Sequence, residues 1–159
     1  MVRHERPTAD PFETGTSMCD LHRHEHRVVG EMTTVAAVVL GALVGAPLRY
    51  HIDRLVQTRH SSVFPWGTLV VNLLGCFVFG GLGAFLQAGV VAPDSFTYAL
   101  IGTGLCGTLT TYSTFGYETL RLLEDRASLH ALANVMISVL AGLGAASVGY
   151  GLMTGIMSL

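Results

Sequence analysis

The chain has 159 residues, of which 50% are hydrophobic and 13% charged, and its formal net charge is −2. This composition excludes a water-soluble globular domain, since such domains carry about 25% charged residues. Its uncharged runs are long enough to cross a bilayer, which takes about 20 residues. We therefore predict an all-α, multi-pass protein of the cell membrane. Its single transmembrane domain, 32–159, has four helices, at about 32–50, 63–90, 95–120 and 131–157.

Residues 1–31 precede the first span and contain prolines and many charges but no apolar stretch. A signal peptide needs an apolar central region, so we interpret this segment as a polar, disordered tail. His22, His24 and His26 could bind a metal ion, but ligands at this spacing without a distant partner make a poor preformed site. Because Met32 stands directly before the first span, we also expect the tail to be dispensable for function.

The arginines carry little information about orientation in the membrane. All nine basic residues are arginines, four of them before the first span and five from its C-terminal end onward. Positive charge near the ends of the spans sets the orientation of a membrane protein. The nearly even distribution therefore permits insertion in both directions, as in antiparallel dimers.

The first span carries a small-residue stripe and ends in a charge. Gly41 and Gly45 are four residues apart, a spacing that lets another helix approach closely, and we interpret this stripe as a packing face. Arg49 follows the bend that Pro47 imposes. Its side chain either extends to the lipid headgroups or turns inward, where its charge would face an anion.

The second span begins at Pro65, a residue suited to a helix start, and at Trp66, which is typical of the membrane interface. On a helix, Thr68, Asn72 and Phe79 fall on one face. A face with a hydroxyl, an amide and an aromatic ring does not point to lipid. Asn72 is therefore either an interhelical hydrogen-bonding residue or a donor in a binding site.

The third span contains a polar, glycine-rich stretch, 102–115, that bears no charge. Its glycines and its run of hydroxyl-bearing residues weaken a continuous helix, so we predict a broken helix. Irregular backbone at membrane depth is tolerated only where it is buried in protein or lines a wet cavity, and in transporters such breaks mark ion sites. The alternative is that the glycines serve close helix packing alone.

Aromatic and polar residues continue this pattern into the last span. Tyr112 and Phe115 are three residues apart and share a face with Glu118. Two rings are usually part of a core, but their positive edges can also solvate an anion. Asn134 and Ser138 form a polar entry to a seam of small residues in the last span, namely Gly142, Ala145 and Gly149.

Three motifs occur in order along the chain: GAPLRY at 45–50, GTLVVNLLG at 67–75 and GTLTTYSTF at 107–115. With them, the segment from about Met32 to the last span resembles the Fluc (CrcB-type) fluoride channel family. The resemblance implies an antiparallel, dual-topology dimer of four-helix subunits with two fluoride pathways. It also implies a structural sodium ion (Na+) at the dimer centre, bound by backbone carbonyls at the breaks of the third helices.

The same resemblance implies roles for individual residues. Asn72 is the implied pore amide, and Tyr112 and Phe115 are the implied pair of aromatic rings. The implied sodium ligands are the carbonyl groups of Gly107 and Thr110. The other implied positions of the ion pathway are polar or charged: Arg49, Thr68, Thr114, Glu118 and Ser138.

Two positions depart from the family pattern. The usual double glycine of the third motif is Gly107-Thr108 here, and Tyr112 replaces the usual first Phe. A tyrosine keeps the positive ring edge but adds a hydroxyl that could bind water or the anion. These departures leave open whether the chain works as a homodimer or beside a second, similar chain.

We predict a fluoride-selective channel that lets cytoplasmic fluoride leave the cell down its gradient and so lowers fluoride toxicity; no nucleic-acid partner is expected. A proton-coupled exporter would need a buried acidic residue within a span, and the uncharged runs contain none. An enzyme with Ser113 as nucleophile is disfavoured, because every histidine lies in the tail or a connection. A partner subunit without conductance is the remaining alternative.

Overall fold

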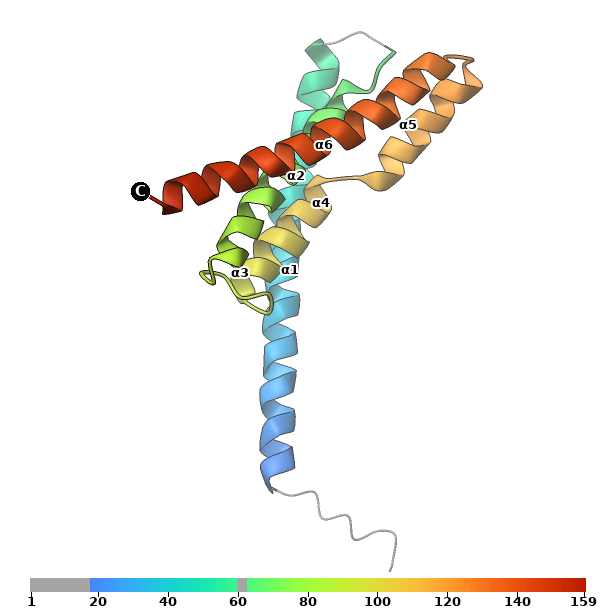
Figure 1. The fold of residues 1–159 in the computed structure, drawn as a ribbon. Helices are drawn as coiled ribbons and strands as arrows, with labels where there is room; N and C mark the ends of the chain where they lie inside the picture. Colours follow the sequence, from blue (N-terminus) through green and yellow to red (C-terminus); the bar gives the residue numbers. More distant parts are fainter. Residues whose placement is uncertain (1–17, 60–62) are drawn as a thin grey trace, which may run out of the picture. The chain divides into compact units, whose positions relative to one another are not determined.

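The computed structural model describes residues 18–59 and 63–159, with side chains from residue 29 onward. The regular secondary structure of these residues is helical, and they contain no strand (Figure 1). The prediction of an all-α protein is therefore confirmed for the described part of the chain. The chain divides into two compact units, Met1–Met32 and Thr33–Leu159.

The described part of the first unit is helical. It belongs to α1 (Met18–Arg59), whereas we predicted disorder throughout the tail. The difference has a local cause, because after Gly15 the next helix breaker is Gly30 and the residues between them include good helix formers such as Leu21, Arg23 and Glu25. Residues 1–17 and the side chains of the histidine cluster at 22–26 lie outside the described residues.

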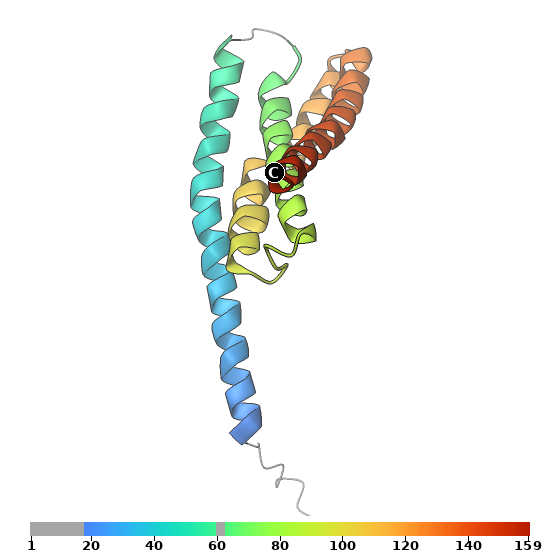
Figure 2. The same cartoon turned by 60° about the vertical axis from the view of Figure 1, so that its left-hand side comes forward.

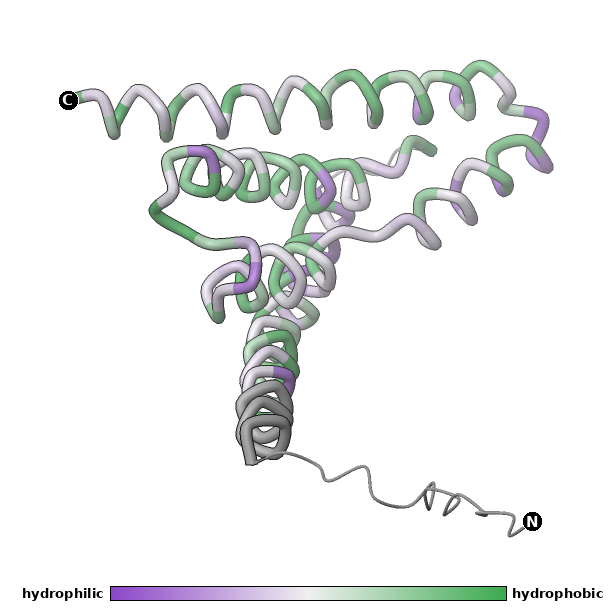
Figure 3. Tube along the Cα trace, turned by 60° about the horizontal axis from the view of Figure 1, so that its bottom comes forward, coloured by the Kyte–Doolittle hydropathy of each residue, from purple (hydrophilic) through white to green (hydrophobic). Residues whose placement is uncertain are grey.

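The second unit contains the rest of α1 and the remaining helices. They are α2 (Trp66–Gln87), α3 (Phe96–Tyr98), the π-helix η1 (Ala99–Cys106), α4 (Gly107–Leu109), α5 (Tyr112–Glu124) and α6 (Ser128–Met157). Within the described residues, three helical stretches are long and apolar enough to cross a membrane: Val29–Arg59, Trp66–Gln87 and Ser128–Met157. Hydrophobic residues cover much of α2 and α6, and hydrophilic ones gather at the turn between α5 and α6 (Figure 3).

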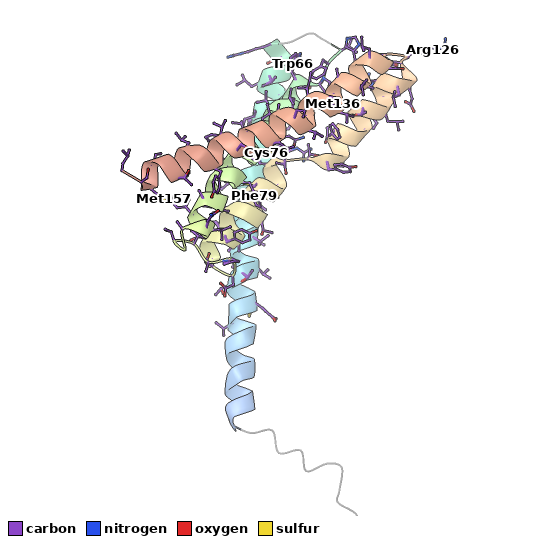
Figure 4. All side chains as sticks on the ribbon, viewed as in Figure 1. Trp66, Cys76, Phe79, Arg126, Met136 and Met157 are labelled. Atoms are coloured by element: carbon purple, nitrogen blue, oxygen red, sulfur yellow. The ribbon has the colours of Figure 1, made fainter. Side chains whose placement is uncertain are left out.

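Helices α2 and α6 pack directly against each other (Figure 1). A Cβ atom on Gly149 would collide with the carbonyl oxygen of Phe77 and would lie 3.1 Å from the amide nitrogen of Gly81. Cys76 lies where the two helices cross (Figure 4), 3.5 Å from the position of a Cβ atom on Gly142. The prediction of a small-residue seam in the last span is confirmed at Gly142 and Gly149. We call this contact the α2–α6 seam.

The glycine stripe of α1 packs against η1 and α4, which lie beside it in Figure 2. A Cβ atom on Gly41 would lie 2.7 Å from the amide nitrogen of Leu105, and one on Gly45 would lie 2.6 Å from the Leu105 carbonyl oxygen. In turn, a Cβ atom on Gly104 would lie 2.6 Å from the carbonyl oxygen of Val38. The interpretation of Gly41 and Gly45 as a packing face is confirmed.

Candidate functional site

The candidate site is built around the two residues between α4 and α5, which we call the α4–α5 junction. Thr110 (φ −79°, ψ 161°) and Thr111 (φ −150°, ψ 121°) are extended. Consecutive β-branched residues favour extended backbone, and the Thr111 hydroxyl caps α5 by accepting a hydrogen bond from the Thr114 N–H (3.2 Å). Helix α2 approaches the junction at Gly75, where a Cβ atom would collide with the Thr110 methyl group.

Asn72 on α2 holds the junction through its side-chain amide. The Thr111 N–H donates to Asn72 Oδ1 (2.8 Å), and Asn72 Nδ2 donates to the Thr111 carbonyl oxygen (3.2 Å). A side-chain amide carries two N–H bonds, so the half-buried Asn72 keeps one N–H that no described residue accepts. Both roles left open by the sequence, an interhelical hydrogen bond and a site donor, are therefore compatible with its geometry.

The carbonyl groups of Gly107 and Thr110 are released from helical hydrogen bonding by the same arrangement. In a continuous helix each carbonyl accepts from the N–H four residues later. Here the Thr111 N–H goes to Asn72 and the Thr114 N–H goes to the Thr111 hydroxyl. The two carbonyls therefore lack these partners, and unwound backbone carbonyls of this kind are typical ligands of sodium in membrane proteins. The chemistry of this donor set fits a sodium ion.

Tyr112 and Phe115 follow the junction and form a ring pair. Their centroids are 6.1 Å apart and their planes meet at 44°, which is within the range of favourable aromatic pairs. Phe115 is half-buried, whereas the Tyr112 side chain is 86% exposed in the single chain. The Tyr112 ring therefore faces outward, toward whatever surrounds this chain.

Arg49 from α1 reaches the first turn of α5. Its Nη2 donates to Thr114 Oγ1 (2.8 Å), and Thr111 Oγ1 donates to the same oxygen (3.0 Å). Of the two poses considered for Arg49, the structure has the inward one. Thr111 was not among the predicted site residues, although its position three residues before Thr114 is a recognisable capping signal.

Thr68 on α2 and Glu118 on α5 contact each other. Thr68 is buried and its hydroxyl donates to Glu118 Oε1 (2.9 Å), while Glu118 Oε2 is buried and has no hydrogen-bonding partner among the described residues. Glu118 also lines a cavity of about 470 Å³ that includes Trp66, Arg121 and Asp125. Two residues that were predicted separately as pathway positions are thus brought together beside this cavity.

Ser138 and Asn134 on α6 do not share the environment of the junction. Ser138 is half-buried and makes no hydrogen bond to the residues that the structure describes. Asn134 is 2% exposed and its Nδ2 donates to Thr119 Oγ1 (2.9 Å), which donates to the Phe115 carbonyl oxygen (2.7 Å). Asn134 therefore contacts the helix that carries the ring pair, a link that its sequence pattern did not reveal.

The family model described as "CrcB-like protein, Camphor Resistance (CrcB)" matches residues 36–150. The chain is 59% identical over 112 residues to "Fluoride-specific ion channel FluC 1" of Streptomyces avermitilis, covering 70% of this chain and 89% of the relative. It is 55% identical over 117 residues to the protein of the same name from Frankia casuarinae, again covering 70% and 89%. These relatives are named as ion channels, not as enzymes.

Proposed function

The chain belongs to the family of CrcB-like proteins, and on this premise we propose that it is a fluoride-selective channel through which cytoplasmic fluoride leaves the cell down its gradient. The observation that carries this proposal is the 59% identity to a relative named as a fluoride-specific ion channel, over 89% of that relative's length. All three motifs on which the sequence interpretation depends lie within the matched residues 36–150. Such a channel would lower the toxicity of fluoride.

The transmembrane arrangement that we propose has four spans. Three of them are the long apolar helices, and the remaining one is the segment from α3 to α5, interrupted at the α4–α5 junction. This segment has no charged side chain before Glu118. Its irregular backbone is buried against α2, which satisfies the rule that such backbone occurs in membranes only where protein or a wet cavity covers it.

We propose that two copies form an antiparallel, dual-topology homodimer around a structural sodium ion. The weak arginine asymmetry permits both orientations. A pair of released carbonyls, those of Gly107 and Thr110, is too few for a complete coordination shell, so a second copy would supply the same pair. When bound, sodium would supply positive charge between the two junctions. The 86% exposure of Tyr112 fits a ring that lies against a second subunit.

Fluoride loses most of its water in a narrow pathway, so the protein must replace the lost hydrogen bonds. The free N–H of Asn72 and the hydroxyl of Thr114 are the donors near the junction. The ring pair of Tyr112 and Phe115 would present positive edges to the anion. Thr68, Glu118 and Ser138 would continue this polar pathway toward its ends.

Efflux from liposomes that contain only this purified chain tests the proposal. A cation ionophore balances the charge that leaves with the anions. The fluoride and chloride that appear outside the liposomes are measured with ion-selective electrodes. We expect fast fluoride efflux with negligible chloride efflux. Chloride efflux as fast as that of fluoride would contradict the proposed selectivity, and well-folded protein that releases neither ion would show that the chain is not a channel by itself.

A further inference from the structure

The threonine hydroxyls around the junction differ in where they donate. Those of Thr108, Thr110 and Thr119 donate to the carbonyl oxygen four residues earlier, at 2.6, 2.9 and 2.7 Å. This bond is the usual way in which a helical threonine satisfies its proton at membrane depth. Thr114 lies in the first turn of α5 and makes no such bond to its own helix.

The Thr114 oxygen instead accepts two hydrogen bonds. One comes from the Arg49 guanidinium (2.8 Å) and the other from the Thr111 hydroxyl (3.0 Å). A hydroxyl oxygen has two lone pairs and one proton, so both acceptor sites are occupied and the proton must point elsewhere. No described residue accepts it. An unmet donor in a half-buried position is costly, which indicates that a ligand or water is its partner.

The groups that hold Thr114 are themselves fixed. The Thr111 backbone is bonded at both its N–H and its C=O by the amide of Asn72. Arg49 is half-buried and, within the described residues, Thr114 is its one side-chain hydrogen-bonding partner. A permanently charged donor on the Thr114 oxygen makes the hydroxyl proton more positive. The result is a preoriented, polarised donor of the kind that stabilises anions in sites shielded from water.

We propose that Arg49 acts on fluoride through Thr114: by occupying the threonine oxygen together with Thr111, it commits the Thr114 proton to the anion. Arg49 is then a positioning residue and not a surface charge that attracts anions from solution. This inference rests on the proposed function. It adds a specific prediction, namely that the contribution of Arg49 to fluoride permeation exists only while the Thr114 hydroxyl is present.

A double-mutant cycle in liposomes tests this dependence. We expect Arg49→Gln and Thr114→Val, which is close in shape but lacks the hydroxyl, each to slow fluoride efflux by about tenfold or more. The double variant should be no slower than the slower single variant. Thr114→Ser keeps the hydroxyl and should restore efflux to nearly that of the wild type. Independent, multiplying effects of the two substitutions would overturn the inference.

Ionic strength supplies a second test that needs no change at Thr114. Attraction of anions by an exposed charge is screened at 1 M salt, where the Debye length is about 3 Å, whereas a direct hydrogen bond is not. The effect of Arg49→Gln should therefore be the same at about 0.1 M and 1 M ionic strength. An effect that disappears at high salt would show that Arg49 acts by long-range attraction and would overturn the inference.

Arg54→Gln is the matched control. Arg54 lies on the same helix, is exposed, and donates to the Tyr50 hydroxyl (2.9 Å) instead of Thr114. The Arg54→Gln variant should leave fluoride efflux unchanged at both salt concentrations. Should the Thr114→Val chain not fold, the salt comparison of Arg49→Gln with Arg54→Gln decides the question. Absence of efflux from the well-folded wild-type chain would instead show that the chain is not a channel by itself, so this failure is distinguishable from a failure of the inference.

Discussion

The α2–α6 seam and the α4–α5 junction both bring α2 against another part of the chain, but they are stabilised in opposite ways. In the seam, Gly80 and Gly149 let backbone contact backbone, and no side chain could be added at these positions. At the junction, the side chain of Asn72 replaces the hydrogen bonds that a continuous helix would have made. The seam therefore depends on the absence of side chains, and the junction on the presence of one.

This contrast separates stability from function. At Gly80 and Gly149 in the seam backbone contacts backbone, so these contacts offer no side-chain group that could bind an ion. The hydrogen bonds at the junction leave specific groups free, namely the second N–H of Asn72 and the carbonyls of Gly107 and Thr110. Substitutions in the seam should therefore prevent folding, whereas many substitutions near the junction should change permeation in a folded protein.

The largest effect is expected for Gly149→Leu. A Cβ atom there would collide with the Phe77 carbonyl oxygen and would lie 3.0 Å from the carbonyl carbon, so the helices must separate. We expect no monodisperse protein in size-exclusion chromatography. Gly151→Leu is the control, since nothing lies within 4 Å of a Cβ atom at that glycine on the same helix. Equal yields of the two variants would show that the seam does not stabilise the fold.

Asn72→Leu should have the next largest effect. It removes the partners of the Thr111 N–H and C=O, and each orphaned buried group costs about 1–3 kcal/mol. We expect a lower midpoint of thermal unfolding, followed by the fluorescence of the single tryptophan, together with loss of fluoride efflux. An unchanged midpoint with lost efflux would show that Asn72 serves the anion alone and does not hold the junction.

The sequence predicts a contact well when the residues that form it are close together in the chain, and poorly when they are far apart. The four-residue spacing of Gly41 and Gly45 and the small residues of α6 predicted the packing faces, because a helical face is a local property. The i, i+3 spacing of Tyr112 and Phe115 likewise placed the two rings side by side. By contrast, Asn72 and Thr111 are 39 residues apart and Arg49 and Thr114 are 65 apart. No spacing rule connects such pairs, so these contacts required the structure.

The same limit explains what the sequence did not reveal. The sequence did not predict the π-helical form of η1, which packs closely against the glycines of α1. Asn134 appeared in the sequence as one of two polar residues at i, i+4, without any indication that it, and not Ser138, is the buried one. Burial depends on which helix lies opposite, and this is a property of the assembled fold.

Phe115→Ala should leave the fold intact and reduce fluoride efflux. The ring is half-buried and its loss removes one of the two positive ring edges near the junction. We therefore expect fluoride efflux to fall by about tenfold, which corresponds to about 1.4 kcal/mol in the barrier. Phe96→Ala is the control, because Phe96 is also a partly exposed aromatic residue but lies on α3. Normal efflux in the Phe115 variant would remove the ring pair from the pathway.

Asn134→Leu tests whether α6 supports the helix that carries the ring pair. The substitution keeps the branching of the side chain but removes the hydrogen bond to Thr119 (2.9 Å), and the Thr119 hydroxyl still has the Phe115 carbonyl as acceptor. We therefore expect a stability loss of only about 1 kcal/mol, seen as a small decrease in the thermal midpoint. A loss as large as that of Asn72→Leu would mean that α6 and α2 stabilise this region equally.

Tyr112→Phe should have the smallest effect, and it distinguishes the ring from its hydroxyl. Within the described residues the Tyr112 hydroxyl makes no hydrogen bond, and the side chain is 86% exposed. If the positive ring edge alone serves the anion, the variant should fold normally and discriminate against chloride as the wild type does. Its fluoride efflux rate should be within about twofold of the wild-type rate. The measurement is the ratio of fluoride to chloride efflux from the same liposomes. A ratio that rises or falls by about tenfold would instead show that the phenol donates to the anion, because a single added donor changes binding by that amount.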